Sequence, residues 1–345
     1  MDLEGSTSLE TIPATHSILD ANALLALTAR VYSLDPLINC FLLRHSWNDT
    51  YQLLTKSARY IARIYGVAWH TLSEIQFEID LLQHLAKQNA PVAAPILRTD
   101  GQVITKVQAP EGIRYLVLFP YAPGEVPAIP IGNQDQSYHF GSALAAIHAA
   151  ADTFRSSLAC IHYDLETLLD RPIATLRPYL AHRLADWHYL VEVTKEIRAG
   201  VTKLLPHGLD WGIIHGDPLS GNARITSDNQ VIWYDFEFCG FGWRALDLAH
   251  AYASAQDHED NSGLVWNAFL KGYRSKRPIG ETDLAAMPFL SAAADLWSMS
   301  INLVKGPIEG FECFDDGFFD NRLKWLRESV AIYRGIGHQR AIDPN

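Results

Sequence analysis

Three side chains suited to phosphate chemistry lie close together in the sequence, each beside an apolar run. Asp217 follows Ile213-Ile-His-Gly, Asn222 stands five residues later, and Asp235 follows Val231-Ile-Trp-Tyr. In phosphoryl transfer an Asp takes the proton of the attacking hydroxyl, while an Asn and a second Asp hold Mg²⁺. Mg²⁺ prefers a few carboxylate or amide oxygens and shares its shell with water and phosphate. The string therefore predicts Asp217 as a base and Asn222 and Asp235 as metal ligands.

Each of these acids, taken alone, is also typical of a turn, and Asp217 stands between Gly and Pro. The complete string is more specific, because it requires His-Gly-Asp, an Asn, an apolar strand, Asp-Phe-Glu and Asp-Leu-Ala in that order. Glu237 supplies a further oxygen ligand beside Asp235. The ordered set favours a catalytic role for these residues over a purely structural role in turns.

Short strands are expected to position these residues. Trp211–His215 reads as a buried strand, and Gly and Pro residues then mark a loop. Ala223–Thr226 and Val231–Tyr234 read as two further strands joined by a polar turn. The candidate ligands would thus lie on loops at strand ends, a common place for catalytic groups.

Residues 213–249 resemble the aminoglycoside phosphotransferase and choline kinase superfamily, whose motif is His-Gly-Asp, Asn, a strand ending in Asp, and Asp-Leu-Ala. The resemblance implies that Asp217 is the catalytic base and that Asn222 and Asp235 bind Mg²⁺. It also implies that His215 is a structural catalytic-loop residue and that Asp247 braces the loop from the next helix.

The resemblance extends upstream, where three strands are expected at 41–45, 51–55 and 60–65. It implies that Asn48, in a turn over Ser46–Thr50, covers the phosphates, although this turn has no glycine. No Walker-type phosphate loop occurs in the chain.

Arg63 fits the phosphate-binding cation that this superfamily carries on the third strand. Apolar spacing predicts a helix over 72–87, and Glu78 on it is the expected ion-pair partner of Arg63. The alternative is that Arg63 lies on a solvated strand edge and Glu78 on a solvated helix face.

Strands at 102–107 and 114–119 precede Pro120–Glu125, a breaker-rich stretch typical of a hinge. By the resemblance, backbone groups near Phe119 and Tyr121 bind adenine. A helix is expected over 135–150, and its His148 is interpreted as structural.

These features predict an α+β, protein-kinase-like fold with an N-terminal extension (1–34), an ATP-binding lobe (35–120) and a catalytic lobe (121–345). Further likeness points to the homoserine-kinase and stress-response-kinase branch. Helical patterns cover 17–32, 162–205, 262–275, 282–304 and 316–334. Gly240–Ala245 matches a dinucleotide fingerprint but opens no βαβ unit, so its glycines are interpreted as flexible turn residues.

Composition favours a cytoplasmic enzyme that binds neither nucleic acid nor membrane. The net charge of −11 opposes general nucleic-acid affinity, and no apolar run reaches the length of a membrane span. The four cysteines show neither disulfide nor zinc spacing, and no His-x-x-x-His pattern indicates a transition metal. Asp257, Glu259 and Asp260 form an acidic loop that either is solvated surface or binds an ammonium group of the acceptor.

The expected activity is ATP- and Mg²⁺-dependent phosphate transfer to a hydroxyl of a small molecule. Two alternatives stay open: a stress-response-type protein Ser/Thr kinase and a nucleotide-binding regulatory module without turnover. The short segment between Asp235 and Asp247 favours small acceptors, and the intact Asp217, Asn222 and Asp235 set disfavours a mere sensor. The acceptor, the nucleotide preference and the oligomeric state cannot be read from the sequence.

Overall fold

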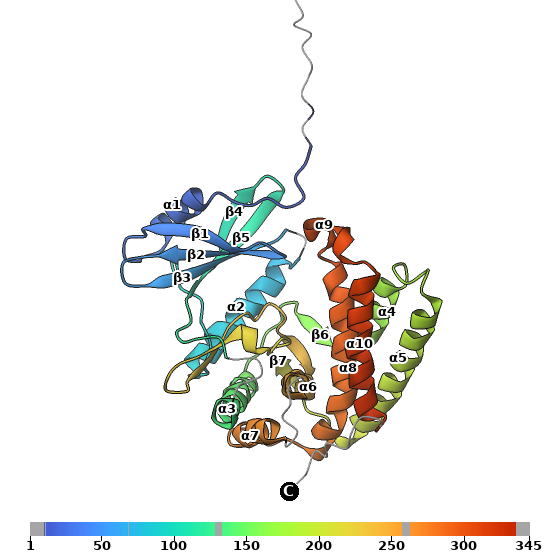
Figure 1. Ribbon diagram of the computed structural model, residues 1–345. Coiled ribbons are helices and arrows are strands. Elements are labelled where there is room, and N and C mark those ends of the chain that lie inside the picture. Colours follow the sequence, from blue (N-terminus) through green and yellow to red (C-terminus); the bar gives the residue numbers. More distant parts are fainter. Residues whose placement is uncertain (1–9, 11, 68, 128–132, 257–262, 336–345) are drawn as a thin grey trace, which may run out of the picture. The chain divides into compact units, whose positions relative to one another are not determined.

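The chain contains an antiparallel N-terminal sheet and a mainly helical C-terminal part (Figure 1). The structure is a computed structural model that describes residues 10, 12–67, 69–127, 133–256 and 263–335. Contacts divide it into two compact units, Met1–His70 with Ile96–Leu118, and Thr71–Pro95 with Phe119–Asn345. The predicted α+β class is confirmed.

The sheet of the first unit has five strands in the order β1-β2-β3-β5-β4. Their bounds are β1 Asn39–Arg44, β2 Asn48–Leu54, β3 Arg59–Tyr65, β4 Thr105–Ala109 and β5 Gly112–Pro120. The expected turn over Ser46–Thr50 is wrong, because β2 already begins at Asn48. Asn48 pairs with Tyr65 and Asp49 with Ile64, so these side chains belong to a strand and not to a loop.

Helix α1 (Ala21–Val31) supplies apolar side chains to the core of the first unit. It begins four residues later than the apolar pattern suggested, because the side chain of Asp20 caps it by accepting from the Ala23 N–H at 2.8 Å. Leu24 and Tyr32 pack with Tyr51, Leu53 and other residues of the sheet.

In the second unit, helix α2 (Leu72–Lys87) has the predicted bounds. Thr71 and Glu74 form a reciprocal capping box at its start, which fixes that end. Helix α3 (Gln134–Ala151) packs along α7 (Leu264–Arg274). The helix predicted over 135–150 is therefore confirmed.

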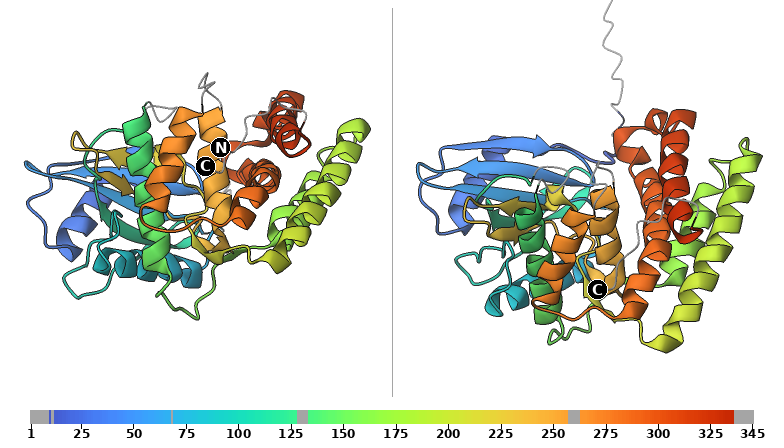
Figure 2. Two further views of the ribbon diagram at one scale, coloured as in Figure 1. Left: turned by 90° about the horizontal axis from the view of Figure 1, so that it is seen from below. Right: turned by 60° about the horizontal axis from the view of Figure 1, so that its bottom comes forward.

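Helix α8 (Glu281–Leu303) packs against α4 (Arg171–Leu176), α5 (Leu184–Leu204) and α10 (Asp316–Tyr333), and Figure 2 shows this group from two sides. It is the one described helix that is long and apolar enough to cross a membrane by composition, although the sequence suggested no such run. Because 61% of its most apolar 18-residue window is buried inside the structure, α8 has the character of a core helix. The short helix α9 (Gly306–Glu309) follows it.

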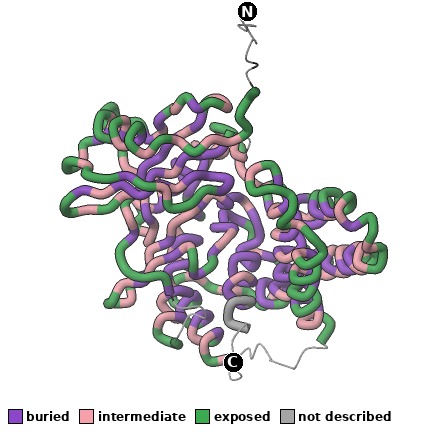
Figure 3. The backbone as a smooth tube through the Cα atoms, turned by 45° about the horizontal axis from the view of Figure 1, so that its top comes forward, coloured by how far each residue is buried: buried purple, intermediate pink, exposed green. Residues whose placement is uncertain are grey.

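The strands between α3 and Arg244 in the sequence form two small sheets. Strands β6 (Ile161–Tyr163), β10 (Gly240–Trp243) and β7 (Trp211–Ile214) form one, in that order, and β8 (Ala223–Ile225) pairs with β9 (Val231–Trp233) in the other. Helix α6 (Arg244–Gln256) follows β10, and most of β7 and the first turns of α6 are buried (Figure 3).

Two expectations are wrong here. Residues 161–163 form a strand and not the start of a helix, and Gly240 and Gly242 lie in a buried strand and not in a flexible turn. The physical reason is close packing, since a Cβ on Gly240 would lie 2.2 Å from the Ile161 carbonyl oxygen. Glycine at this position lets the two strands approach closely. A sequence pattern alone does not distinguish such a glycine from one that forms a turn.

Candidate active site

The His-Gly-Asp turn follows directly from buried strand β7. Gly216 has a φ of 83°, a left-handed conformation that favours glycine. A Cβ at this position would lie 2.1 Å from the Phe238 carbonyl oxygen and 2.8 Å from the Tyr163 hydroxyl. Gly216 therefore lets the chain turn sharply while it lies against the 238 backbone, which delivers Asp217 to a half-buried position.

Asp217 and Asn222 are brought together by the short 3₁₀ turn Ser220–Asn222. The Asn222 side-chain amide donates to the Asp217 carboxylate Oδ2 at 2.7 Å and to the Asp217 main-chain oxygen at 2.9 Å. Because both acceptors are oxygens, Nδ2 is the donating atom, and Oδ1 is the atom of Asn222 with the capacity to bind a cation. The Tyr234 N–H donates to the Asn222 carbonyl at 3.0 Å and so ties the turn to the end of β9.

Asp235 and Glu237 follow β9, and both are half-buried. Asp235 has a φ of 64°, one of three non-glycine residues with positive φ in the described chain. Asp tolerates this conformation better than most residues, and backbone strain of this kind gathers at functional sites. One of these three residues is therefore the position predicted as a metal ligand.

Asp247, fully buried at the start of α6, holds the turn through backbone groups. Its two oxygens accept from the His215 N–H at 2.8 Å and the Gly216 N–H at 3.0 Å. Burial alone would raise the pKa of Asp247, but the hydrogen bonds that it accepts from His148 and from the His215 backbone outweigh burial and hold the pKa below its usual value. Asp247 is therefore an anion that braces the loop, the position that the resemblance implied for it.

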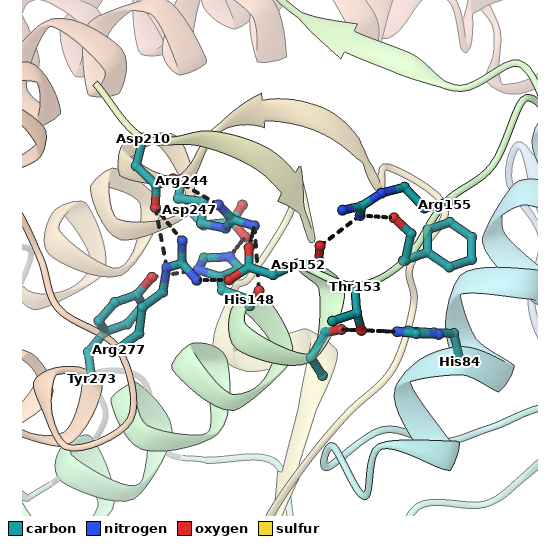
Figure 4. Close-up of polar contacts among 12 residues, drawn as sticks. His84, His148, Asp152, Thr153, Arg155, Asp210, Arg244, Asp247, Tyr273 and Arg277 are labelled. Atoms are coloured by element: carbon teal, nitrogen blue, oxygen red, sulfur yellow. Dashed lines mark hydrogen bonds and ion pairs between the residues drawn. The ribbon is translucent and has the colours of Figure 1, made fainter. Parts of the chain in front are cut away.

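His148 of α3 connects Asp247 to α7. Its Nε2 lies 2.9 Å from Asp247 Oδ2 and its Nδ1 lies 2.7 Å from the Tyr273 hydroxyl (Figure 4). Burial lowers the pKa of His148 despite the nearby Asp247 carboxylate, so the ring is neutral. With an anion on one side and a hydroxyl on the other, Nε2–H donates to Asp247 and Nδ1 accepts from Tyr273.

A square of two arginines and two aspartates lies behind this chain of contacts (Figure 4). Arg244 donates to Asp210 at 2.9 Å and to Asp152 at 2.6 Å. Arg277 donates to the second oxygen of Asp210 at 2.9 Å and also contacts Asp152. The square ties together the end of α3, the approach to β7, the start of α6 and the segment after α7.

Tyr163 and Tyr273 are functional-site residues that sequence reasoning missed. Tyr163 is fully buried and donates to the Phe238 carbonyl at 2.7 Å. Burial raises its pKa well above the usual value, and the charges of Asp217, Glu237 and Asp247 add to that rise. Nothing in the sequence links Tyr163 to a motif whose backbone it contacts 75 residues away.

Other predicted site residues lie elsewhere. In the first unit, Asn48 Oδ1 accepts from the Gly66 N–H at 3.2 Å, and Arg63 lies half-buried in β3. In the second unit, Glu78 is buried on α2, Phe119 is buried, and the Tyr121 hydroxyl accepts from Arg224 at 2.9 Å. Asp257, Glu259 and Asp260 lie outside the described residues.

The donor set suits a hard divalent cation. Asn222 Oδ1 and the carboxylates of Asp235 and Glu237 are oxygen ligands of the kind that Mg²⁺ binds, and thiol or imidazole ligands would be needed for a softer metal. The amide of Asn222 is held in the required orientation by Asp217. The residue types therefore fit a hard divalent cation such as Mg²⁺.

Comparison with known proteins agrees with this geometry. Residues 43–281 match the model of the phosphotransferase enzyme family. An uncharacterized protein of Synechocystis is 35% identical over 322 residues, 92% of this chain and 88% of that protein. Homoserine kinase of Neisseria meningitidis is 28% identical over 244 residues, 70% of this chain and 74% of that enzyme.

A solved structure extends the likeness to the fold. Amicoumacin kinase hAmiN, determined in complex with AMP-PNP, Ca²⁺ and Ami, has a TM-score of 0.69 and 18% identity. The match covers 90% of this chain and 93% of that chain. The predicted protein-kinase-like fold is thereby confirmed.

Proposed function

Because the chain belongs to the phosphotransferase enzyme family, we propose that it transfers the γ-phosphate of ATP to a hydroxyl group of a small molecule in the presence of Mg²⁺. The observation that carries the proposal is the 2.7 Å contact between Asn222 and the carboxylate of Asp217. It joins a residue suited to metal binding with one suited to proton removal.

Asp217 serves as the base in this proposal. Its carboxylate orients the acceptor hydroxyl and takes the proton as the oxygen–phosphorus bond forms, while the bond from the γ-phosphorus to ADP breaks. Asn222 holds the carboxylate in place through its amide, and Asp247 holds the backbone of the turn through His215 and Gly216. All of these residues belong to the second unit.

Asn222, Asp235 and Glu237 would hold Mg²⁺, with Asn222 contributing its amide oxygen. The bound ion would neutralise charge on the phosphate oxygens. The left-handed backbone of Asp235, directly after strand β9, supports a special role for that position.

We assign nucleotide contacts to Arg63, with Glu78 as its partner, to Asn48, and to the backbone near Phe119 and Tyr121. Supporting the ion pair, the Glu78 side chain is only 4% exposed, and a buried carboxylate requires a cation or several hydrogen bonds. Asn48 accepts a hydrogen bond from the Gly66 N–H, which supports an additional role in holding the backbone at the end of β3.

The acceptor is proposed to be small. Residues 240–243 between Asp235 and Asp247 are taken up by strand β10, so this segment offers no long docking loop for a protein substrate. The four cysteines show no disulfide spacing in the sequence, which supports a reducing compartment such as the cytoplasm.

The test is Mg²⁺-dependent ATP consumption by the wild type and Asp217→Asn across amino alcohols, homoserine, sugars, aminoglycosides and a generic protein substrate. We expect one small acceptor to stimulate turnover and the substitution to reduce kcat by about 10²–10⁴-fold, the usual contribution of a general base.

Asp228→Asn is the matched control, because Asp228 lies exposed on the β8–β9 turn and bonds only with its neighbours Thr226 and Gln230 among the contacts found. This control should retain wild-type turnover. Stimulation that persists in Asp217→Asn would refute the proposed base, and stimulation by protein alone would overturn the small-molecule assignment.

A further inference from the structure

A cluster of two histidines and one aspartate lies in the first unit, and none of its members is assigned to catalysis. His16 comes from the segment before α1, His45 from the turn after β1, and Asp49 from β2. One ligand atom from each residue lies within 4.8 Å of the other two. His45 Nδ1 lies 2.7 Å from Asp49 Oδ1, and His16 Nε2 lies 3.2 Å from both Asp49 oxygens.

We propose that His16, His45 and Asp49 form a binding site for a divalent transition metal of the zinc class. Two imidazoles and a carboxylate are the ligands that such ions prefer over the all-oxygen sets of Mg²⁺. Ligand atoms around a four-coordinate ion with bonds near 2.05 Å lie about 3.4 Å apart. The two nitrogen–oxygen separations, 2.7 and 3.2 Å, are somewhat shorter, so the ligands would move slightly apart to take up an ion. Three protein ligands leave the fourth position to water.

The surroundings have the features of a built site. Asp49 is fully buried, and the His16 side chain is only 6% exposed. Arg114, also fully buried, lies with its Nη1 2.9 Å from Asp49 Oδ2, which orients the carboxylate and leaves Oδ1 toward the two histidines. A hydrogen-bond donor behind a ligating carboxylate is typical of metal sites.

Arg114 is itself fixed by main-chain groups. It donates to the carbonyl oxygens of Tyr65, Ile64 and Ser17 at 2.9–3.0 Å. It therefore cannot swing into the space between the imidazoles. His45, whose side chain is 32% exposed, is the ligand with room to adjust toward an ion.

The competing interpretation is a hydrogen-bonded cluster in which the imidazole N–H groups donate to Asp49. A metal requires the lone pairs of the same nitrogens, so binding moves each ring proton to the other nitrogen of a neutral imidazole. No oxidant or further reactant is involved. The two interpretations predict different metal affinities for the wild type.

A bound ion would tie the segment before α1 to the β1–β2 turn. Ser17 already bonds to Glu111 through its hydroxyl at 2.6 Å, and Tyr51 donates to the Leu19 carbonyl at 2.7 Å, so the segment is held at neighbouring points. The metal is therefore structural in this proposal, and its loss should lower stability without removing a reacting group. The inference stands independently of the proposed phosphotransferase function.

The experiment is calorimetric titration of Zn²⁺ into the full chain in excess Mg²⁺, which occupies oxygen-ligand sites. We expect one Zn²⁺ per chain and a raised melting temperature. His16→Gln and His45→Gln should each weaken binding at least about tenfold, since even outer-shell substitutions cost 10–100-fold. His182→Gln is the matched control, because His182 pairs with Asp316 at 2.9 Å in an exposed position.

X-ray absorption of the Zn²⁺-loaded wild type gives a second readout that needs no variant. Scattering from two imidazoles supports the site, because the catalytic oxygen ligands contain no imidazole. A wild type that binds no Zn²⁺ under these conditions, binding unchanged in both His variants, or a spectrum without imidazole would overturn the proposal.

Discussion

At the scale of single residues, Asn222 contacts the proposed base and is itself a proposed metal ligand, and Asn222→Asp tests this double role. The change places a second carboxylate at hydrogen-bond distance from Asp217. Two such carboxylates retain a shared proton to higher pH, because like charges disfavour the doubly ionised pair. We expect kcat to fall at least about tenfold and the acidic limb of the kcat–pH profile to move to higher pH.

The shift of the profile distinguishes this role from simple misfolding, which lowers kcat without moving the limb. Asn229→Asp on the β8–β9 turn serves as the control, because Asn229 is only partly buried and its side-chain amide donates to Asp135, which has no proposed catalytic role. An Asn222→Asp enzyme with a reduced rate but the wild-type profile would contradict the proposed coupling.

At the residue scale, the sequence predicted contacts between side chains that lie within one short motif. The spacing of Asp217 and Asn222 anticipated their contact, because five residues of turn bring them together. The relay from Asp247 through His148 to Tyr273 could not be found in this way, since His148 and Tyr273 are 125 residues apart and meet only when α3 packs on α7. The acidic loop around Asp257 lies outside the described residues, so its role stays a prediction.

At the scale of elements, strand β10 depends on glycine for its close approach to β6. Gly240→Ala would place a Cβ 2.2 Å from the Ile161 carbonyl oxygen, so one strand must shift. We expect a loss of about 1–3 kcal/mol in the free energy of unfolding, the usual cost of overpacking. Chemical denaturation followed by fluorescence measures it.

Gly221→Ala is the matched control, since a Cβ there meets nothing within 4 Å. It should change stability by no more than about 0.5 kcal/mol, as surface substitutions do. Equal effects of the two substitutions would show that β6 and β10 do not pack as closely as described.

Element prediction succeeded for long amphipathic helices and failed for short buried strands. Helix α2 was placed with its bounds correct, because its apolar spacing and its Thr71 cap are local signals. Strands β6 and β10 are three and four residues long, and their pairing joins residues 161–163 to 240–242. Such pairing gives no local signature in either segment. The local residue patterns therefore predicted a helix from residue 162 and a turn at 240–245 in place of the two strands.

At the scale of the whole molecule, two neutral histidines in the core make stability depend on pH. His148 and His215 have no exposed surface, and burial lowers the pKa of each despite nearby carboxylates. In the unfolded chain both would titrate near the ordinary value of about 6.5. Below that pH the unfolded state therefore binds more protons than the native state, so stability rises with pH and is lost as pH falls.

The expected loss between pH 7.5 and 5.5 is about 1.4 kcal/mol per buried histidine, or roughly 3 kcal/mol for the pair, while both stay neutral in the native state. Asp247 acts in a different window, because its lowered pKa gives stability that is lost only as pH falls below about 4. Urea denaturation at several pH values measures the slope between these limits. His148→Gln, which keeps an amide donor for Asp247, should remove about half of the slope. A free energy of unfolding that is constant from pH 7.5 to 5.5 would mean that the two rings titrate in the native core as they do in the unfolded chain, and the neutral state assigned to His148 would then be wrong.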